Sequence, residues 1–386
     1  MSISLKTENK RKPLKNTYRS LEKIGVKLVD DSNYTEYINS QNADWRRHHV
    51  MQGDLTSFDG LSLRYYYAMQ PEPAIINDLL CEKSSDNLLS SRASSKVHNA
   101  KGCIVILHGY CGFWGKFHEM AEYYWQAGYD VFFLEQRGHG YSGRQTDDKD
   151  MVHVNDYTDY IKDLKMFMDN IVLPKTLSTP HILFAHSMGG AVATLFLENY
   201  PDYFSAAILS SPMLSINTGN ISKATVYLLR AKIKILHRKL QPFPGGKRFD
   251  GIPAFATSST RSAVRYKYIF EQRLADAHYH TYMLSNGWGC ASFKATSKTL
   301  KNAHKISIPI LLLTAGNDSL VTMDGCTKFK KKAASVEHIH FENAKHELFN
   351  DTDDVRRNYY SRIFYFTEEN FEKANIENPK VPDNQK

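Results

Sequence analysis

The stretch Phe184-Ala185-His186-Ser187-Met188-Gly189-Gly190 decides how the rest of the chain is interpreted. Its serine lies between the short apolar run 182–185 and a segment, 189–199, that has the pattern of a helix. This order is typical of a sharp turn between a strand and a helix, which raises a serine hydroxyl above a sheet. Such a turn needs small residues two positions before and after the serine. Gly189 fits, and Ala185 stands where glycine is more usual. Ser-Met-Gly-Gly would also fit an ordinary helix start, so the surrounding sequence must decide.

Short apolar runs alternate with helical patterns on both sides of this turn. Strands are expected at 103–107, 130–134, 182–185, 206–209, 308–314 and 338–342, and helices at 116–127, 155–171, 189–199, 323–334 and 355–369. A hairpin is expected before them, with strands at 55–58 and 61–68 around the turn Asp59-Gly60. Strands separated by helices predict an α/β fold with a mostly parallel sheet and helices on both faces.

The alternation stops between residues 214 and 305, where helical patterns dominate. This segment holds 16 Lys and Arg residues and three acids, a net charge of +13, while the rest of the chain carries −5. We therefore predict a polar N-terminal extension (1–50), an α/β core (51–213 and 306–386) and a helical, basic lid (214–305). Concentrated positive charge indicates an acidic partner, either nucleic acid or an anionic lipid surface. The polar stretch 77–100 is predicted to be an exposed loop.

One helix of the predicted lid, expected at 221–240, is amphipathic. Its apolar face would hold Thr225, Leu229, Ile233, Leu236 and Leu240, with Lys223, Arg230, Lys234, Arg238 and Lys239 mainly outside it. A basic amphipathic helix can lie at an anionic membrane interface. It can equally be an ordinary lid helix that packs on the sheet and leaves its basic face in water.

Two later positions complete an order in which a serine is followed by an acid and then a histidine. Asp318 follows the apolar run 310–313, where the end of a strand would present a carboxylate. Asp324 is a rival acid, although its place before a helical pattern favours a capping role. His346 lies after the next expected strand and before the last helix. The predicted catalytic residues are therefore Ser187, Asp318 and His346.

These residue types suit nucleophilic catalysis near neutral pH. A serine hydroxyl becomes an effective nucleophile when an imidazole removes its proton, and histidine can return that proton to the leaving group. An aspartate fixes the imidazole tautomer and stabilises the imidazolium. The developing oxyanion needs two backbone N–H donors. We expect them from Met188, directly after the serine, and from Tyr110, in the loop after strand 103–107, a loop that His108 is expected to shape.

Three longer motifs carry a resemblance to a known family. They are Arg137-Gly138-His139-Gly140-Tyr141-Ser142-Gly143-Arg144, His153-Val154-Asn155-Asp156-Tyr157 and Ala185-His186-Ser187-Met188-Gly189-Gly190-Ala191. With the late Asp and His, they resemble the α/β-hydrolase superfamily in its monoacylglycerol lipase and lysophospholipase branch, and in particular the bacterial lysophospholipases L2. The resemblance covers about residues 102–371 and is weakest in the lid. Glu135 departs from the pattern, because aspartate is usual there, and 77–100 looks like an insertion.

The resemblance implies an α/β-hydrolase fold with an inserted lid and a serine ester hydrolase that forms an acyl-enzyme on Ser187. The implied substrate is a single-chain lipid ester, above all a lysophospholipid, and no cofactor is implied. The basic lid would attract phosphate head groups or an anionic membrane surface. The alternatives are a monoacylglycerol lipase or general carboxylesterase, a serine aminopeptidase of the same superfamily, and a hydrolase-fold binding protein without catalysis.

Other classes of function find little support in the sequence. The 16 histidines are scattered, and the pair His278 and His280 lacks an obvious third ligand, so no metal site is predicted. No glycine-rich nucleotide loop is present, and a basic patch without a readout motif is weak evidence for nucleic-acid binding. Five widely spaced cysteines do not suggest a disulfide framework.

The sequence also lacks the signals of a membrane-spanning or secreted protein. No apolar run approaches the roughly 18 residues of a membrane span. Residues 1–15 are polar and basic, unlike a secretory signal. We expect a cytoplasmic protein that binds peripherally to the inner face of the cytoplasmic membrane.

Overall fold

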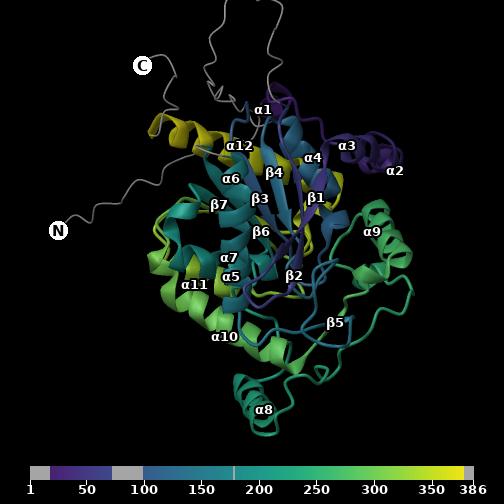
Figure 1. Ribbon diagram of the computed structural model, residues 1–386, viewed down its shortest axis with the longest axis vertical. Coiled ribbons are helices and arrows are strands. Elements are labelled where there is room, and N and C mark those ends of the chain that lie inside the picture. Colours follow the sequence, from purple (N-terminus) through teal and green to yellow (C-terminus); the bar gives the residue numbers. More distant parts are fainter. Residues whose placement is uncertain (1–17, 72–98, 177–178, 378–386) are drawn as a thin grey trace, which may run out of the picture.

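A computed structural model describes residues 18–71, 99–176 and 179–377, and its centre is an eight-stranded sheet (Figure 1). The strands are β1 (Met51–Thr56), β2 (Ser62–Ala68), β3 (Cys103–Leu107), β4 (Asp130–Leu134), β6 (His181–His186), β7 (Ala206–Ser210), β9 (Ile310–Ala315) and β10 (Val336–Phe341). Their order is β1-β2-β4-β3-β6-β7-β9-β10. β2 is antiparallel to β1 and β4, and all pairs from β4 to β10 are parallel. The predicted mostly parallel sheet is confirmed.

Helices connect the strands and cover the sheet. They are α1 (Tyr18–Lys23), α2 (Asp31–Asn39), α3 (Gln41–His49), α4 (His118–Gln126), α5 (Thr158–Phe167), α6 (Leu173–Thr176), α7 (Met188–Asn199), α8 (Lys223–Ile235), α9 (Ala263–Ala275), α10 (Asn286–Asn302), α11 (Met323–Lys330) and α12 (Asp353–Glu377). Short 3₁₀ turns include η3 (Trp114–Phe117), η7 (Ala277–Tyr279) and η9 (Leu348–Asn350). A two-stranded ladder joins β5 (Met151–Val152) to β8 (Met283–Leu284).

Alternate side chains of the central strands enter two hydrophobic cores, one on each face of the sheet. In β3, Cys103, Val105 and Leu107 face the core that includes residues of α5, α7, α10 and α11. Ile104 and Ile106 face the core that includes residues of α1, α3, α4 and α12. All five side chains are fully buried. Strands buried on both faces explain why the sequence shows continuous apolar runs here rather than alternation with polar residues.

The expected elements largely coincide with the observed ones, and the main difference lies in the predicted lid. The helix expected at 221–240 ends at Ile235, because His237 adopts a left-handed conformation with φ of 51°. The N–H of His237 donates to the carbonyl of Lys234, and that of Arg238 to the carbonyl of Ile233. This pair of bonds closes the helix in the manner of a Schellman motif.

The segment 214–305, the predicted lid and called the lid below, contributes three helices, of which α8 and α10 differ in how they meet the body. Helix α10 packs on α7, and the indole of Trp288 donates to the hydroxyl of Tyr160 over 3.2 Å. Helix α8 stands away from the sheet at the lower end of the molecule in Figure 1. Among the described residues, no helix is long and apolar enough to cross a membrane.

The N-terminal helices are packed on the body rather than separate from it. Tyr34, Tyr37 and Ile38 of α2 are buried together with Tyr268 and Ile269 of α9. Aromatic and aliphatic residues in an otherwise polar segment therefore supply an apolar contact with the lid.

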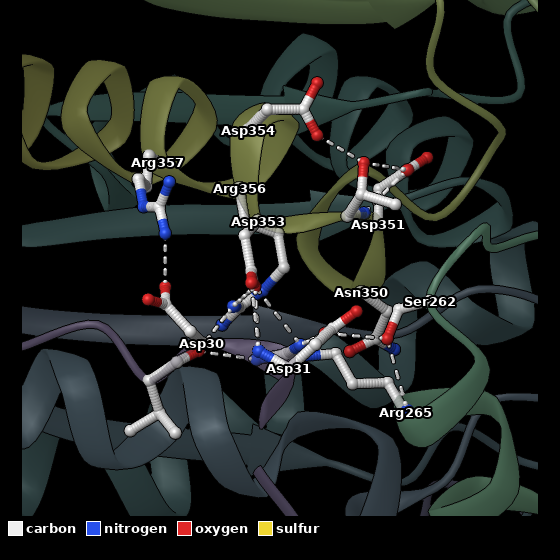
Figure 2. Close-up of polar contacts among 12 residues, drawn as sticks. Asp30, Asp31, Ser262, Arg265, Asn350, Asp351, Asp353, Asp354, Arg356 and Arg357 are labelled. Carbon is white, nitrogen blue, oxygen red and sulfur yellow. Dashed lines mark hydrogen bonds and ion pairs between the residues drawn. The ribbon is translucent and has the colours of Figure 1, made fainter. Parts of the chain in front are cut away.

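A buried charge network reinforces this contact, and Figure 2 shows how Asp31, Arg265 and Arg356 lie within it. Arg265 of α9 is fully buried and bonds to the carboxylates of Asp31 and Glu119. Arg356 of α12 donates to the same Glu119 over 2.5 Å, and Arg265 and Arg356 both donate to the carbonyl of Val29. Burial alone raises the pKa of Glu119, but the two guanidinium groups outweigh it and lower the pKa below its ordinary value. The network thus joins the N-terminal segment, α4, the lid and α12.

Candidate active site

Ser187 lies between β6 and α7 in a strained conformation. Its φ of 53° and ψ of −118° are unfavourable for a residue with a side chain. Hydrogen bonds hold the turn in place, because the N–H of Ser187 donates to Ser210 and its carbonyl accepts from Met213. The serine is only 9% exposed and sits at the carboxyl end of the sheet. The strand, turn and helix predicted around this serine are all present.

Two glycines bring the loop after β3 against the serine. A Cβ on Gly189 would lie 2.6 Å from the carbonyl oxygen of His108, so only glycine lets α7 approach the end of β3 this closely. A Cβ on Gly109 would lie 2.8 Å from the Cβ of Ser187. The loop after β3 therefore passes directly beside the serine side chain.

A chain of hydrogen bonds joins the three residues that the sequence singled out. The Oγ of Ser187 lies 2.8 Å from Nε2 of His346, and Nδ1 of His346 lies 2.6 Å from Oδ2 of Asp318. The second oxygen of Asp318 accepts from the N–H groups of Leu320 and Val321. Burial alone raises the pKa of Asp318, but its bond to His346 and these N–H groups lower it. A carboxylate held this way orients the imidazole with Nδ1 as donor and Nε2 free to accept the serine proton.

The rival acid lies outside this chain. Asp324 is in the first turn of α11, its side chain is 63% exposed, and it pairs with Lys328 over 2.5 Å. His338 and His340, on strand β10, both lie within hydrogen-bond distance of the Thr314 hydroxyl and not of Ser187. The structure therefore brings Asp318 and His346 to the serine and leaves the other candidates elsewhere.

The predicted oxyanion donors flank the serine. Residues 109–112 form a tight turn in which the N–H of Gly112 donates to the carbonyl of Gly109 over 2.9 Å. Tyr110 is the second residue of this turn, and Met188 is the first residue of α7. Within the described residues, neither backbone N–H has a hydrogen-bond acceptor. Both groups are therefore available to a substrate oxygen.

Buried neutral histidines support this region. His108 is fully buried, and burial lowers its pKa to about 4. Its Nδ1 lies 2.7 Å from the carbonyl oxygen of Gly109, and its Nε2 accepts from the N–H of Gln136. Burial also lowers the pKa of His186 to about 3, and its ring lies 4.9 Å from that of His346. His108 thus shapes the turn that contains Tyr110, as expected.

An ion pair that was not predicted from the sequence lies beside His346. Lys116 of η3 lies 2.5 Å from the carboxylate of Glu347, and both side chains are nearly buried. Burial alone raises the pKa of Glu347, but Lys116 outweighs it and the pKa is lowered to about 2. The N–H of Glu347 also donates to the lid residue Ser259. Lys116 and Glu347 are 231 residues apart in the sequence, so no local sequence pattern predicts that they form a pair.

Glu135, where the resemblance leads one to expect aspartate, links two loops near the site. Its carboxylate accepts from the N–H of Trp114 over 3.0 Å and from the N–H of Tyr141 over 2.7 Å. Burial raises its pKa to about 7, although the two N–H groups act in the opposite direction. A Cβ on Gly140 would collide with this carboxyl group, so the longer acid depends on glycine there. In the described part of the chain, no group of three or more His, Cys, Asp or Glu residues could hold a metal ion.

Comparisons with known proteins identify the relatives of this chain. A monoacylglycerol lipase from Mycolicibacterium smegmatis is 29% identical over 255 residues, which are 65% of this chain and 83% of that protein. A probable lysophospholipase L2 from Haemophilus influenzae is 26% identical over 306 residues, 79% of this chain and 88% of that protein. The resemblance inferred from the motifs is confirmed by these similarities.

Solved structures and a family model extend the comparison. A soluble variant of monoglyceride lipase from Saccharomyces cerevisiae, in complex with a substrate analogue, superposes with a TM-score of 0.60. It is 18% identical and covers 84% of this chain and 96% of its own, a likeness of fold alone. The model of the family described as serine aminopeptidase, S33, matches residues 98–353. Because this match spans more than half of the chain, the chain belongs to the S33 family of α/β hydrolases.

Proposed function

We propose that this chain is a serine ester hydrolase that cleaves the acyl ester of a lysophospholipid through an acyl-enzyme on Ser187. The observation that carries the proposal is the hydrogen-bond chain from Ser187 through His346 to Asp318. The backbone N–H groups of Tyr110 and Met188, for which the described part of the chain provides no acceptor, support it further. Nucleophile, base, orienting acid and oxyanion donors are the parts that acyl transfer requires.

In the proposed reaction, Oγ of Ser187 bonds to the ester carbonyl carbon while its proton passes to Nε2 of His346. The carbonyl electron pair moves to the oxygen, which the N–H groups of Tyr110 and Met188 stabilise. The carbon–oxygen bond of the ester then breaks, and His346 gives its proton to the departing glycerophosphate alcohol. A water molecule attacks the acyl-serine by the same steps, releasing the fatty acid and restoring the serine hydroxyl.

The substrate class is supported by the relatives and by the charge of the lid. The named relatives include a monoacylglycerol lipase and a probable lysophospholipase L2, both of which point to single-chain lipid esters. The lid carries +13, which favours a substrate with a phosphate group over a neutral glyceride. Monoacylglycerol lipase or general carboxylesterase activity is therefore the second candidate.

Serine aminopeptidase activity, which the family description suggests, is less well supported. A substrate ammonium group would need a free carboxylate near the nucleophile. Glu347, directly after His346, is already paired with Lys116. Ionisation of Glu135 is disfavoured by its burial. A basic lid would also repel an ammonium group.

A hydrolysis panel combined with covalent labelling tests the proposal. A fluorophosphonate probe should label the wild-type protein at Ser187 and should fail to label Ser187→Ala. The panel compares lysophosphatidylcholine, -ethanolamine and -glycerol with monoacylglycerol, p-nitrophenyl esters and aminoacyl amides. We expect kcat/KM to be higher for a lysophospholipid than for any other substrate of the panel. Absence of labelling would support a non-catalytic binding protein, and preference for aminoacyl amides would support an aminopeptidase.

We further propose that the lid binds an anionic membrane surface. In α8 and the turn after it, Ile233 is buried, whereas Tyr227, Leu228 and Ile235 are 70%, 66% and 73% exposed. Leu236 and Leu240, which were predicted to lie on the apolar face, are also exposed.

Four exposed cations lie among these apolar side chains, at Lys232, Lys234, Arg238 and Lys239. Exposed apolar side chains among cations favour an interfacial helix over one whose apolar face is covered by the sheet.

A further inference from the structure

A lid arginine is bonded to the turn that contains the proposed oxyanion donor. Arg273 of α9 is 7% exposed, and one of its terminal nitrogens donates to the carbonyl of Cys111 over 2.6 Å. The other terminal nitrogen donates to the carbonyls of Tyr279 and Thr281 in the lid, over 3.1 and 3.3 Å. Within the described residues this guanidinium forms no ion pair, so its hydrogen bonds go to neutral carbonyls. A buried cation without a carboxylate partner is costly to maintain, which calls for an explanation.

The turn itself is strained at the residue that Arg273 contacts. Cys111 has a φ of 57°, a conformation that residues with a side chain adopt at a cost of about 1 kcal/mol or more. Such a conformation persists when surrounding bonds fix it. Here the Gly112 N–H holds the carbonyl of Gly109 from one side, and Arg273 holds the carbonyl of Cys111 from the other.

These bonds form a continuous chain that ends at the Tyr110 N–H. The Arg273 guanidinium polarises the Cys111 carbonyl, whose peptide group includes the Gly112 N–H. That N–H donates to the carbonyl of Gly109, whose peptide group includes the Tyr110 N–H. His108 lies against the same Gly109 carbonyl, 2.7 Å away. Hydrogen bonds in such chains strengthen one another, so a cation at one end makes the final N–H a better donor.

We propose that Arg273 is a positioning residue that holds the 109–112 turn and strengthens the Tyr110 N–H as an oxyanion donor. Because Arg273 belongs to the lid, oxyanion stabilisation depends on the lid being seated on the body. The phenol of Tyr110 adds a second tie, donating to the lid carbonyl of Tyr282 over 2.7 Å. The inference rests on the proposed function, since it assumes that Ser187 carries out acyl transfer.

The test compares Arg273→Gln and Arg273→Lys with a matched lid variant, Arg261→Gln. Arg261 also ties the lid to the body, through Asp351 and Thr352, but it does not contact the 109–112 turn. Rates are measured on a soluble p-nitrophenyl ester and divided by the number of sites that a fluorophosphonate titrates. This correction makes the result independent of any misfolded fraction.

For Arg273→Gln we expect kcat to fall about 10- to 100-fold with KM nearly unchanged, a smaller loss than the 10²- to 10³-fold typical of a deleted donor. Inhibition by an alkyl boronic acid, whose tetrahedral adduct places an oxygen at the oxyanion position, should weaken by a similar factor. Arg273→Lys should recover part of both, and Arg261→Gln should change neither by more than about twofold.

Three other results would overturn the inference. If kcat and boronate inhibition of Arg273→Gln stay within about twofold of wild type, or if Arg261→Gln loses as much, Arg273 is only a tie between lid and body. If the wild-type protein neither reacts with the fluorophosphonate nor hydrolyses any ester, the proposed function fails and the role of Arg273 fails with it.

Discussion

The imidazole of His346 bonds to Asp318 through a 2.6 Å contact, although the two residues are 28 positions apart and Asp324 follows the same strand. Two N–H groups fix the second oxygen of Asp318, so this carboxylate cannot easily rotate away. Asp324 points instead to Lys328 on the outer surface of α11. Two acids that lie only six residues apart in the sequence therefore have different surroundings: Asp318 contacts His346, and Asp324 contacts Lys328.

Replacing each acid by its amide tests this distinction. Asp318→Asn should lower kcat by about 10² to 10⁴, because an amide no longer fixes the tautomer or stabilises the imidazolium. Asp324→Asn, which removes only an exposed pair with Lys328, should leave kcat within about twofold. Both are measured by ester hydrolysis after thermal unfolding has shown that the variants are folded. A larger loss in Asp324→Asn than in Asp318→Asn would reassign the acid.

The buried charge network predicts a second, purely structural effect. Glu119→Gln removes a buried carboxylate that accepts hydrogen bonds from both Arg265 and Arg356, and breaking a buried pair typically costs about 3–5 kcal/mol. The free energy of unfolding in urea should fall by that amount. Glu271→Gln is the matched control, because it breaks an exposed pair with Lys267 on α9 and should change stability by less than about 0.5 kcal/mol. Equal effects of the two substitutions would show that the network does not stabilise the fold.

The parts of the fold that sequence reasoning predicted are those fixed by local pattern. Strands β3 and β4 match the expected limits, because β3 is a continuous apolar run and β4 is one after its first residue, Asp130. The positions of Ser187, Asp318 and His346 follow from the same logic, since carboxyl ends of parallel strands meet at one edge of a sheet. Once the strands before them are recognised, the serine, the acid and the histidine can therefore be predicted to lie at the same edge of the sheet.

What could not be predicted depends on contacts between distant segments. Arg273 and Cys111 are 162 residues apart, and no periodicity relates them. The polar composition of residues 1–50 concealed a contact made by a few aromatic and aliphatic side chains of α2. Residues 72–98, which include Cys81 and most of the expected loop 77–100, lie outside the described part of the chain.

The position of Glu135 predicts an unusual dependence of stability on pH. Its folded pKa of about 7 lies above the value of about 4.3 in an unfolded chain, so the protonated form is favoured by folding. Its stabilising contribution is therefore complete below about pH 4.3 and is lost as the pH rises through 7. Relative to Glu135→Gln, which does not titrate, the wild type should lose about 2–3 kcal/mol of unfolding free energy between pH 5 and pH 8.

The change with pH is the quantity to measure, by urea unfolding of both proteins across this range. The absolute stability of Glu135→Gln is less informative, because its amide N–H₂ would face the N–H of Trp114 or Tyr141 and lose one hydrogen bond. A difference between the two proteins that stays constant from pH 5 to pH 8 would mean that Glu135 is ionised throughout in the folded protein.

The exposed side chains of α8 predict how the lid meets a membrane. Reversing the charge of four residues together, Lys232, Lys234, Arg238 and Lys239, should weaken sedimentation with anionic liposomes, since each cation near such a surface contributes about 1 kcal/mol. Binding of the wild type should rise with anionic lipid content and fall at 1 M salt, where the Debye length is about 3 Å. Turnover of a soluble p-nitrophenyl ester should be unchanged, because the side chains of these four residues are exposed and none takes part in the hydrogen-bond chain of Ser187, His346 and Asp318.

Two further variants separate local from general effects. Reversing four exposed lysines of α10 and α11, at Lys298, Lys301, Lys328 and Lys330, changes the net charge equally and should have little effect on binding. Leu228→Ser with Ile235→Ser should weaken binding even to weakly charged liposomes, because it removes apolar surface that would enter the interface. If the protein reversed at Lys232, Lys234, Arg238 and Lys239 binds as well as wild type, the cations of α8 and of the turn after it are only solvated. The preference for a phosphate-bearing substrate would then rest on the relatives alone.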